Sequence, residues 1–418
     1  MNSHNAPEIL IAGAGPGGAI TAIALAKANI PVYLVDKETF PRDKICGDAL
    51  SGKVVEVLKK LDPEILTRLN ASPLKVGSWG VDFFSPNRKK LHVPFRLEYN
   101  TQQDAPGYIA TRLDFDQFLI EEVRKYDLIT FLEGHEADNL IRQGDKYQVT
   151  FKNKSFAPEV KLLIAADGAH SVFAKKLAGI TVEKEHYCGG LRAYYQGVTG
   201  MDADNFIELH FINDVLPGYF WIFPLPDGKA NVGIGMRSDK ISSKKIDLKK
   251  VLKRIIAEDP HIAPRFENAT LLQDIKGYGL PLGSKKRKIS GDGFMLIGDA
   301  ASLIDPFTGE GIGNAMMSGW IAAQTAQNLM HQNIPCSAQN LKAYDQAVYN
   351  RLWSELRLSK VMQEMVNFPW LFNMVVNKAN RNEELRSTIS CMFEDLDMRQ
   401  KLKSPKFYFN LLFADDKK

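Results

Sequence analysis

The chain has 418 residues, of which 45% are hydrophobic and 24% charged, so it can bury hydrophobic cores and lacks the composition of a disordered protein. With about 150 residues in a typical domain, two or three structural units are expected. The net charge of +4 is small and dispersed, which does not favour nucleic acid as a partner. The four cysteines lie far apart without a CxxC pair, and the histidines show no metal-binding spacing, so we predict neither a disulfide framework nor a metal site. Free thiols favour the cytoplasm.

The first elements follow the order strand, glycine turn, helix, strand. We expect a buried strand at 8–12, a helix at 17–28 and a second buried strand at 31–35. Glycines and a proline interrupt the apolar stretch 9–30, and no basic residue precedes it. It is therefore predicted to be neither a membrane span nor a signal peptide.

The rest of the chain alternates between nucleotide-domain elements and strand-rich segments. Helices are expected at 54–69, 114–125, 247–258 and 311–330, and throughout the chain after 344. Strands are expected within 74–95, 130–141, 147–151, 161–165, 189–236 and 294–297. This order predicts one nucleotide-binding domain interrupted by a second, strand-rich domain and followed by a helical tail.

The glycine turn has the spacing GxGxxG, given by Gly13, Gly15 and Gly18. Gly13 permits the tight turn, Gly15 lets the backbone approach a pyrophosphate, and Gly18 lets the helix pack closely on the strand. The helix N-terminus offers N–H groups to phosphate oxygens. Asp36 ends the second strand, where it can accept hydrogen bonds from a ribose. These features predict dinucleotide binding without separating NAD from FAD.

A second motif decides between the two cofactors. Residues 296–315 read LIGDAASLIDPFTGEGIGNA, which resembles the second FAD signature of flavoproteins with the para-hydroxybenzoate hydroxylase fold. The resemblance implies that Asp299 contacts the ribityl chain and pyrophosphate. It also implies that the turn before the next helix faces the cofactor, which adds Pro306, Gly309, Gly311 and Ile312 to the candidate FAD-binding residues.

Two shorter motifs agree with FAD. Asp167 lies in ADGAHS, after a buried strand, and this stretch is similar to the DGxxS motif of the same flavoproteins. Arg112 lies in ATRLDFDQFL and resembles the arginine that precedes FDxxL near the cofactor. Taken alone, Asp114 could be a helix cap and Arg112 a surface residue.

Two further stretches resemble the geranylgeranyl reductase family. PRDKICG at 41–47 is similar to its PxxKxCGG signature, and YFWIFP at 219–224 followed by NVGIG at 231–235 is similar to its YxWxFP…NxGxG segment. One position departs from the pattern, because Asp48 stands where many members have a second glycine. The resemblance covers about residues 6–330. The resemblance adds four residues that follow Asp36 to the candidate cofactor-binding residues: Lys37, Arg42, Cys46 and Gly47.

The motifs together predict an α/β fold with a Rossmann-type FAD/NAD(P)-binding domain, an inserted antiparallel β-sheet domain for the substrate and C-terminal helices. The FAD-binding domain is assigned to 1–73, 106–180 and 281–335, the substrate domain to 74–105 and 181–280, and the C-terminal helical region to 336–418.

Three residues are candidates for the catalytic centre: Cys46, Tyr219 and Trp221. Cys46 is expected near the flavin, with Lys44 able to lower the pKa of its thiol, although a buried, inert thiol is the alternative. Tyr219 and Trp221 alternate on one strand face with Phe223, a pattern that fits either a core or a substrate cavity.

The predicted function is reduction of a carbon–carbon double bond in an isoprenoid or other hydrophobic substrate, with hydride from N5 of reduced FAD and a proton from an acid or water. One alternative is a flavin-dependent monooxygenase or halogenase using NAD(P)H and O₂, because YxWxFP loosely resembles the halogenase segment WxWxIP. Another is a flavoprotein electron carrier without turnover. No second GxGxxG unit is visible, so electrons are expected from transient NAD(P)H or a protein donor such as ferredoxin.

Two surface features remain. The basic run KKRK at 285–288 is expected to be solvated, with a docking patch for a nicotinamide or an acidic partner as the alternative. The apolar tail within 362–413 is expected to fold over the second domain, with contact to a membrane surface as the alternative.

Overall fold

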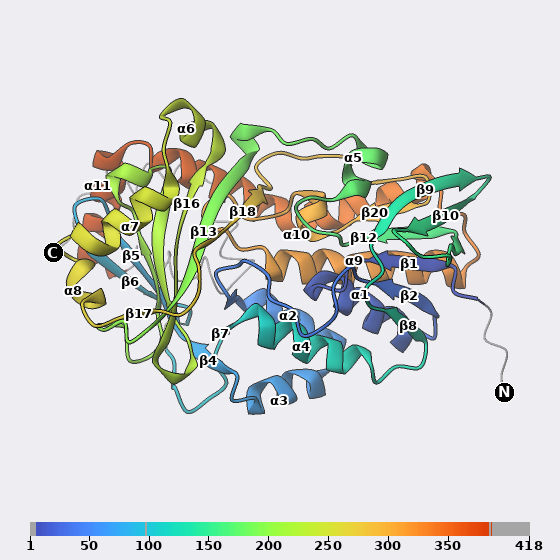
Figure 1. Ribbon diagram of the computed structural model, residues 1–418, viewed down its shortest axis with the longest axis horizontal. Helices are drawn as coiled ribbons and strands as arrows, with labels where there is room; N and C mark the ends of the chain where they lie inside the picture. The colour runs from blue at the N-terminus through green and yellow to red at the C-terminus, as the bar shows by residue number, and fades with distance from the viewer. Residues whose placement is uncertain (1–5, 97, 384–385, 387–418) are drawn as a thin grey trace.

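The computed structural model describes residues 6–96, 98–383 and 386 (Figure 1). Its nucleotide-type half is built on a six-stranded sheet in the order β19-β20-β12-β1-β2-β8. The strands are β1 (Ile9–Ala12), β2 (Val32–Val35), β8 (Ile129–Leu132), β12 (Leu162–Ala165), β19 (Ser290–Gly291) and β20 (Phe294–Leu296). All pairings are parallel except β19 with β20. Both faces are covered, which is why β1 and β12 are apolar along their whole length.

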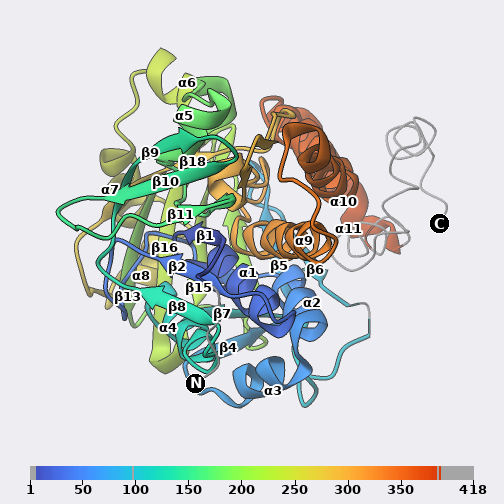
Figure 2. The ribbon, with the colours of Figure 1, turned by 90° about the vertical axis from the view of Figure 1, so that its right-hand side faces the viewer.

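Helices cover both faces of this sheet (Figure 2). They are α1 (Pro16–Lys27), α2 (Gly52–Leu61), α3 (Pro63–Ala71), α4 (Arg112–Val123), α5 (Val172–Ala178), α9 (Ile312–His331) and α10 (Ala338–Met365). Helices α1 and α9 pack closely: a Cβ added at Gly319 would lie 2.5 Å from the carbonyl oxygen of Gly17. The missing side chain therefore lets α9 hold α1, and with it the glycine turn, against the sheet.

The second half is an eight-stranded sheet in the order β17-β13-β16-β15-β14-β5-β6, with β18 also paired to β13. Its strands are β5 (Gly80–Phe84), β6 (Lys90–Pro94), β13 (Tyr187–Gln196), β14 (Ile207–His210), β15 (Gly218–Pro224), β16 (Lys229–Arg237), β17 (Thr270–Leu271) and β18 (Lys276–Pro281). Pairing is antiparallel except between β14 and β5. The helices α6 (Ser238–Ser243), α7 (Leu248–Glu258) and α8 (Ala263–Phe266) belong to this half.

The two faces of the large sheet have different partners, and β15 shows this by its alternation. Phe220 and Ile222 pack in one cluster with Leu252 of α7. Trp221 and Phe223 pack in another, with Phe372 of α11 (Pro369–Arg381). Since successive side chains of a strand point to opposite faces, the Tyr219, Trp221, Phe223 stripe lies on the face away from α7.

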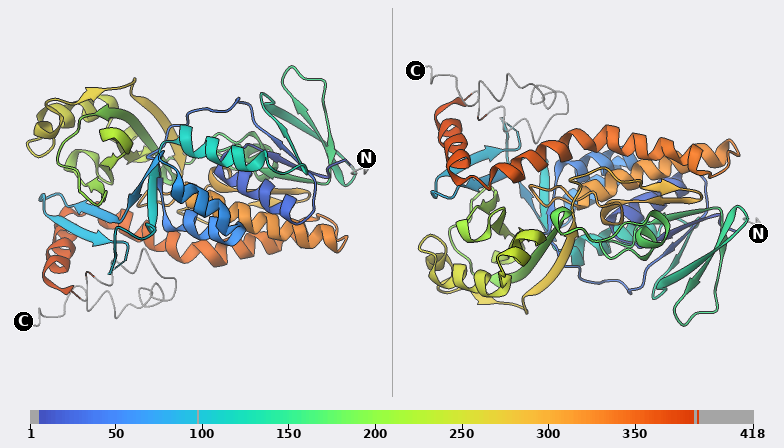
Figure 3. Two further views of the ribbon diagram at one scale, coloured as in Figure 1. Left: turned by 90° about the horizontal axis from the view of Figure 1, so that it is seen from below. Right: turned by 90° about the horizontal axis from the view of Figure 1, so that it is seen from above.

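Two small antiparallel sheets complete the fold. One is formed by β9 (Ala137–Gln143), β10 (Lys146–Phe151) and β11 (Glu159–Val160), and the other by β3 (Ala49–Leu50), β7 (Gly107–Ala110) and β4 (Lys75–Ser78). The long helix α10 runs along the molecule from the six-stranded sheet towards the large sheet and leads into α11 (Figure 3). The α/β fold class predicted from the sequence is confirmed.

One predicted helix was wrong in its extent. The helix expected at 54–69 is divided into α2 and α3, because Asp62 between them is extended, with φ −166° and ψ 112°. Pro63 has no N–H to continue α2, and the Asp62 carboxylate instead accepts a hydrogen bond from the N–H of Glu64 to cap α3. Most of the predicted tail beyond α11 lies outside the described residues. In the part of the chain that the structure describes, no helix is long and apolar enough to cross a membrane.

Candidate active site

The glycine turn joins β1 to α1, and its glycines have separate tasks. Gly13 has φ +107°, and a Cβ there would lie 2.3 Å from the carbonyl oxygen of Ala166; a Cβ at Gly18 would lie 1.9 Å from that of Gly13. At Gly15 the nearest atoms to an added Cβ are side-chain nitrogens of Arg42 at 3.7 Å and Arg112 at 3.9 Å. A small group therefore fits beside Gly15 in contact with two guanidinium groups.

These two arginines share one carboxylate. Arg42 donates to Asp116 at 2.5 Å, and Arg112 donates to the same side chain at 2.7 and 2.6 Å. Burial alone would raise the pKa of Asp116, but the arginines hold it below its ordinary value. The two guanidinium groups thus lie beside the N-terminus of α1, held there by the Asp116 carboxylate. This arrangement suits a bound pyrophosphate.

Asp36, at the end of the second strand, stabilises the glycine turn. Asp36 is buried and accepts hydrogen bonds from the N–H groups of Ala14 at 2.8 Å and Glu38 at 2.9 Å. Its predicted contact with a ribose stays a prediction. The neighbouring candidate Lys37 is mostly exposed, and its amine lies 3.9 Å from the Glu38 carboxylate. The structure does not bring Lys37 to the other candidates.

The second FAD motif lies beside the first. Asp299 lies in a short 3-10 helix (Gly298–Ala301) after β20, and its Oδ2 is 3.2 Å from the amine of Lys44. Oδ1 is the oxygen that remains for hydroxyl donors. The loop that follows ends at Gly311, the N-cap of α9. Among the candidates from this motif, five line one cavity: Asp299, Pro306, Gly309, Gly311 and Ile312.

Asp167 stands behind the turn rather than at the cavity. One carboxylate oxygen accepts from the N–H of Val172 at the start of α5, and the other is buried without a partner in the structure. Burial raises its pKa to about 6. The unpartnered oxygen leaves a free acceptor near the glycine turn, so the predicted cofactor contact of Asp167 remains a prediction.

The cavity has a volume of about 1220 Å³ and extends from the cofactor motifs to the large sheet and α11. Its lining includes Cys46, Gly47, Arg112, Tyr219 and Trp221, all of them sequence candidates. Its apolar walls come from all parts of the chain, among them Val81, Phe83, Leu209, Phe211, Phe223, Phe307, Met362, Phe372 and Val376. Such a lining favours a large hydrophobic ligand.

The Cys46 side chain is a thiol rather than a thiolate. Burial raises its pKa, and the opposing positive charges of Arg112 and Lys44 do not cancel that effect. Lys44 lowers this pKa as expected, but the net shift is upward because desolvation of the thiolate is the larger effect. No described residue is disulfide-bonded to Cys46.

The two aromatic candidates use their polar atoms within the protein. The Tyr219 hydroxyl donates to the carbonyl of Thr308 in the cofactor loop, and burial raises its pKa. The indole N–H of Trp221 donates to Asn231 at 2.8 Å. What remains for a ligand is aromatic surface, which fits a substrate cavity better than acid–base chemistry at these residues.

Sequence reasoning missed a buried polar network beside Cys46. Asn231 donates to the carbonyl of Cys46 and to the carboxylate of Asp48, both at 2.8 Å, and Tyr194 donates to Asp48 at 2.6 Å. Arg192, 1% exposed, lies with its guanidinium 4.0 Å from the centre of the Tyr194 ring. A signal was present, since Arg192 is a charged residue within an otherwise strand-forming stretch.

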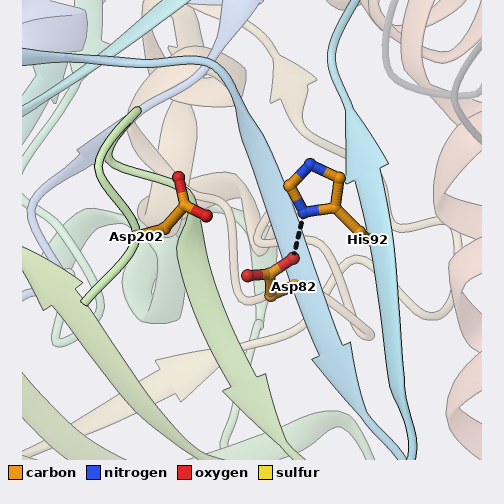
Figure 4. A group of neighbouring side chains, drawn as sticks. All are labelled: Asp82, His92 and Asp202. Atoms are coloured by element: carbon orange, nitrogen blue, oxygen red, sulfur yellow. Dashed lines mark hydrogen bonds and ion pairs between the residues drawn. The ribbon is translucent and has the colours of Figure 1, made fainter. Parts of the chain in front are cut away.

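One group of side chains could hold a metal ion. Asp82, His92 and Asp202 lie within reach of a common centre on the large sheet (Figure 4). Asp82 is already engaged by His92 at 2.7 Å and by the amine of Lys90 at 2.6 Å. None of the three lines the cavity. We therefore interpret the group as an ion-pair cluster that joins β5 and β6.

Comparison with known proteins identifies the family. Residues 7–207 match the model of an FAD binding domain, and residues 191–278 match that of a geranylgeranyl reductase catalytic domain. The digeranylgeranylglycerophospholipid reductase of Methanocaldococcus jannaschii is 31% identical over 86% of this chain and 87% of its own length. The chain belongs to the geranylgeranyl reductase family. The resemblance predicted from its motifs is thereby confirmed.

Other members of the family and its fold agree. The menaquinone reductase of Mycobacterium tuberculosis is 29% identical over 78% of this chain and 77% of its own. The solved structure of a geranylgeranyl bacteriochlorophyll reductase-like protein from Thermoplasma acidophilum shares the fold, with a TM-score of 0.77 over 96% of both chains at 23% identity. As a member of this family, the chain is an FAD-dependent oxidoreductase.

The residues present fit FAD. The position beside Gly15, flanked by the guanidinium groups of Arg42 and Arg112, suits the pyrophosphate. The free oxygen of Asp299 suits the ribityl hydroxyls, and the N-terminus of α9 at Gly311 suits a negatively charged edge of the flavin. These assignments to single residues are predictions, whereas the cofactor itself follows from the family.

Proposed function

We propose that the chain reduces carbon–carbon double bonds of an isoprenoid or other hydrophobic substrate. The observation that carries this proposal is the cavity, which begins at Asp299 and Gly311 of the FAD motif and ends among apolar side chains of β5, β14 and α11. A polyisoprenoid chain offers the apolar surface and the double bonds that such a site can use. The related reductases act, by their names, on digeranylgeranylglycerophospholipid and menaquinone, both of which carry isoprenoid chains.

Bound FAD in its reduced form supplies hydride from N5. The protein contributes position and a dry environment. Trp221 and Phe223 offer flat aromatic surface, and Phe83, Phe211 and Phe307, which stack on one another, belong to the same hydrophobic cluster at the cavity. An extended chain that lies along this aromatic surface is shielded from water, so that one double bond can be held near the cofactor motifs while the remainder lies in the apolar part of the cavity.

The test is an anaerobic half-reaction. FAD in the purified enzyme is photoreduced, and its reoxidation is followed after addition of a geranylgeranylated glycerolipid, an isoprenoid quinone or a saturated analogue. We expect reoxidation only with the unsaturated compounds, and a gain of two hydrogen atoms per reduced double bond by mass spectrometry. Reoxidation that requires O₂ and gives an oxygenated or halogenated product would instead support the alternative.

That alternative has no observation of its own in this chain. The YFWIFP segment that loosely resembles a halogenase lies within the residues matched by the geranylgeranyl reductase catalytic domain. For the electron donor we propose transient NAD(P)H or a reduced protein such as ferredoxin. Reduction of the oxidised enzyme by NADH, NADPH or ferredoxin in separate anaerobic reactions distinguishes these donors. Failure of all three would favour the flavoprotein without turnover.

We also propose that the substrate enters from a membrane surface at the junction of α10 and α11. Phe368 is 56% exposed and Trp370 67% exposed, next to residues of α11 that line the cavity. Val361, another exposed apolar side chain, lies in a shallow depression with Arg357 and Lys360. Aromatic side chains together with basic ones suit the interface of an anionic bilayer.

Vesicle co-sedimentation tests this surface. The wild-type protein should bind vesicles that contain phosphatidylglycerol, and Phe368→Ser with Trp370→Ser should weaken binding severalfold. Val182→Ser is the matched control, since Val182 is 63% exposed elsewhere. Equal binding by wild type and the double variant would contradict the proposal.

A further inference from the structure

Asp48 is a fully buried acid at the wall of the cavity. Its exposed fraction is 0%, and it lines the cavity together with Cys46 and Gly47. Its φ of +68° lies in the left-handed region, which favours glycine and tolerates asparagine and aspartate. The chain thus keeps an acid at a buried position whose backbone favours glycine.

The hydrogen bonds of Asp48 leave one oxygen free. Oδ2 accepts from the hydroxyl of Tyr194 at 2.6 Å and from the amide of Asn231 at 2.8 Å. Oδ1 is buried and has no hydrogen-bond partner in the structure. Since both partners of Oδ2 are donors, the proton of a neutral Asp48 would reside on Oδ1. That proton then has no acceptor among the described residues, and it belongs to a residue that lines the cavity.

The charges around Asp48 do not hold it ionised. Arg192 of β13 and Arg112 of α4 face it, but each is paired with another carboxylate, Arg192 with Asp43 and Arg112 with Asp116. The titratable neighbours are Tyr194 and Cys46, and both have raised pKa values, so they stay neutral. Burial raises the pKa of Asp48 to about 7, against the hydrogen bonds and arginines that lower it.

Several other carboxylates of the cavity form ion pairs with lysines, whereas Asp305 accepts from the hydroxyl of Ser359 and from the N–H groups of Phe307 and Thr308. Asp299 pairs with Lys44, and Glu310 and Glu355 both pair with Lys53. Among the described residues, no lysine or arginine forms an ion pair with Asp48. Asp48 is therefore distinguished as a carboxyl group that can carry a proton at the cavity near neutral pH.

We propose, building on the proposed function, that Asp48 is the acid that protonates the substrate double bond. The O–H bond at Oδ1 breaks and a C–H bond forms at one alkene carbon, while the hydride equivalent of the reduced cofactor goes to the other carbon. The alkene gains two electrons and two hydrogen atoms, the cofactor is oxidised, and Asp48 is left as a carboxylate. Water reprotonates it when the product leaves. Tyr194 and Asn231 act as positioning residues that direct the proton to Oδ1.

Infrared difference spectroscopy tests the proton without turnover. Between pH 5 and pH 9, the FAD-loaded protein should show a protonated carboxyl band that disappears with a midpoint near 7. Asp48→Asn should lack that band, while Asp345→Asn, which changes a half-buried carboxyl with a raised pKa away from the cavity, should retain it. A spectrum of Asp48→Asn identical to wild type would overturn the proposal.

The second test is the single-turnover reoxidation of photoreduced enzyme by the best unsaturated substrate. General acids typically contribute about 10²- to 10⁴-fold, so Asp48→Asn should slow reoxidation by about 100-fold or more with unchanged FAD content. Asp48→Gly should be equally slow, because glycine accepts the left-handed backbone but has no acid. Asp345→Asn should react at the wild-type rate.

Tyr194→Phe separates proton supply from a merely structural role. It removes a donor that favours the carboxylate, so the pKa of Asp48 should rise and the alkaline loss of rate should move to higher pH. Wild-type rates and pH profiles in Asp48→Asn and Asp48→Gly would overturn the role of Asp48 while leaving the proposed function intact. If no unsaturated compound reoxidises the wild-type flavin, the proposed function fails, and Asp48 is then not the acid of this reaction even where the infrared band titrates.

Discussion

At Gly15 the backbone is extended, with φ −67° and ψ −179°, a conformation that any residue adopts. A valine there would place its side chain against Arg42 and Arg112 without straining the backbone of the turn. Because this is the space that suits the pyrophosphate, we predict that Gly15→Val loses bound FAD while its far-UV circular dichroism and Tm stay close to those of apo wild type. Flavin released per chain is the measurement.

Gly18→Ala provides the contrast. Its Cβ would lie 1.9 Å from the carbonyl oxygen of Gly13, so the turn itself must shift and the Tm of the apoprotein should fall. The pair thus separates a ligand-facing glycine from a packing glycine. A full complement of FAD in Gly15→Val would show that the cofactor phosphates lie elsewhere.

Cys46 lies at the cavity as a protonated thiol, and its predicted role concerns the substrate rather than FAD attachment. Cys46→Ser keeps the size but places a strongly hydrogen-bonding hydroxyl where the substrate is apolar. We predict unchanged FAD content and a severalfold weaker affinity for an unsaturated lipid, measured by the concentration dependence of flavin reoxidation. Cys188→Ser, at another buried thiol on the cavity wall, is the matched comparison. Identical kinetics in wild type and Cys46→Ser would leave Cys46 an inert buried thiol.

At the scale of elements, β15 and the loop before α9 are joined by one side chain. The Tyr219 hydroxyl donates to the Thr308 carbonyl, and Gly309 beside it has φ +72°. Tyr219→Phe removes the bond and keeps the ring. A typical hydrogen bond contributes about 1 kcal/mol, so we predict a few-fold loss of FAD affinity with little change in the chemical step. A reoxidation rate reduced by orders of magnitude would instead make the hydroxyl a catalytic group.

The elements themselves show what the sequence can and cannot predict. The glycine turn, Asp299 and the helix after Gly311 follow from local spacing, and the structure brings them together. The division between α2 and α3 was missed, although Asp62-Pro63 is a local signal. The network of Asp48 was out of reach, because its partners Tyr194 and Asn231 are 146 and 183 residues away. Such contacts depend on how the two sheets face each other.

The same limit holds for the whole molecule. Strands β5 and β6 lie in the same sheet as β13–β18, although the strands between them in the sequence belong to other sheets. Composition suggests this shared sheet only through the strand-rich character of both segments. The predicted domain boundaries therefore remain predictions at residue precision. Because segments far apart in the sequence meet in this way, they build the cavity wall together. The wall takes Cys46 from the first segment, Trp221 from the large sheet and Phe372 from α11.

The meeting of these segments also buries carboxyl groups, so the free energy of unfolding of the whole molecule depends on pH. Asp48 and Asp167 have pKa values raised to about 7 and about 6, against 3.8 for an unperturbed aspartate. A carboxyl whose pKa is higher in the folded state stabilises the fold below its unfolded pKa, and that stabilisation is lost as the pH rises through the folded pKa. Asp116 and Glu208 have lowered pKa values and act in the opposite sense, as the pH falls below their unfolded values.

We therefore predict that the Tm of wild type falls between pH 5 and pH 8, and that Asp48→Asn has a smaller fall. One pKa unit corresponds to 1.36 kcal/mol, and the range from pH 5 to pH 8 covers about two of the pH units between the unfolded and the folded pKa of Asp48, so Asp48 accounts for a loss on the order of 3 kcal/mol in this range, or several degrees in Tm. Differential scanning calorimetry of apoprotein and FAD-loaded protein at each pH measures this. Asp345→Asn controls for the loss of a half-buried acid with a raised pKa. Parallel Tm curves for wild type and Asp48→Asn across this range would mean that Asp48 has the same protonation in the folded and unfolded chains, and a neutral Asp48 at the cavity would then be wrong.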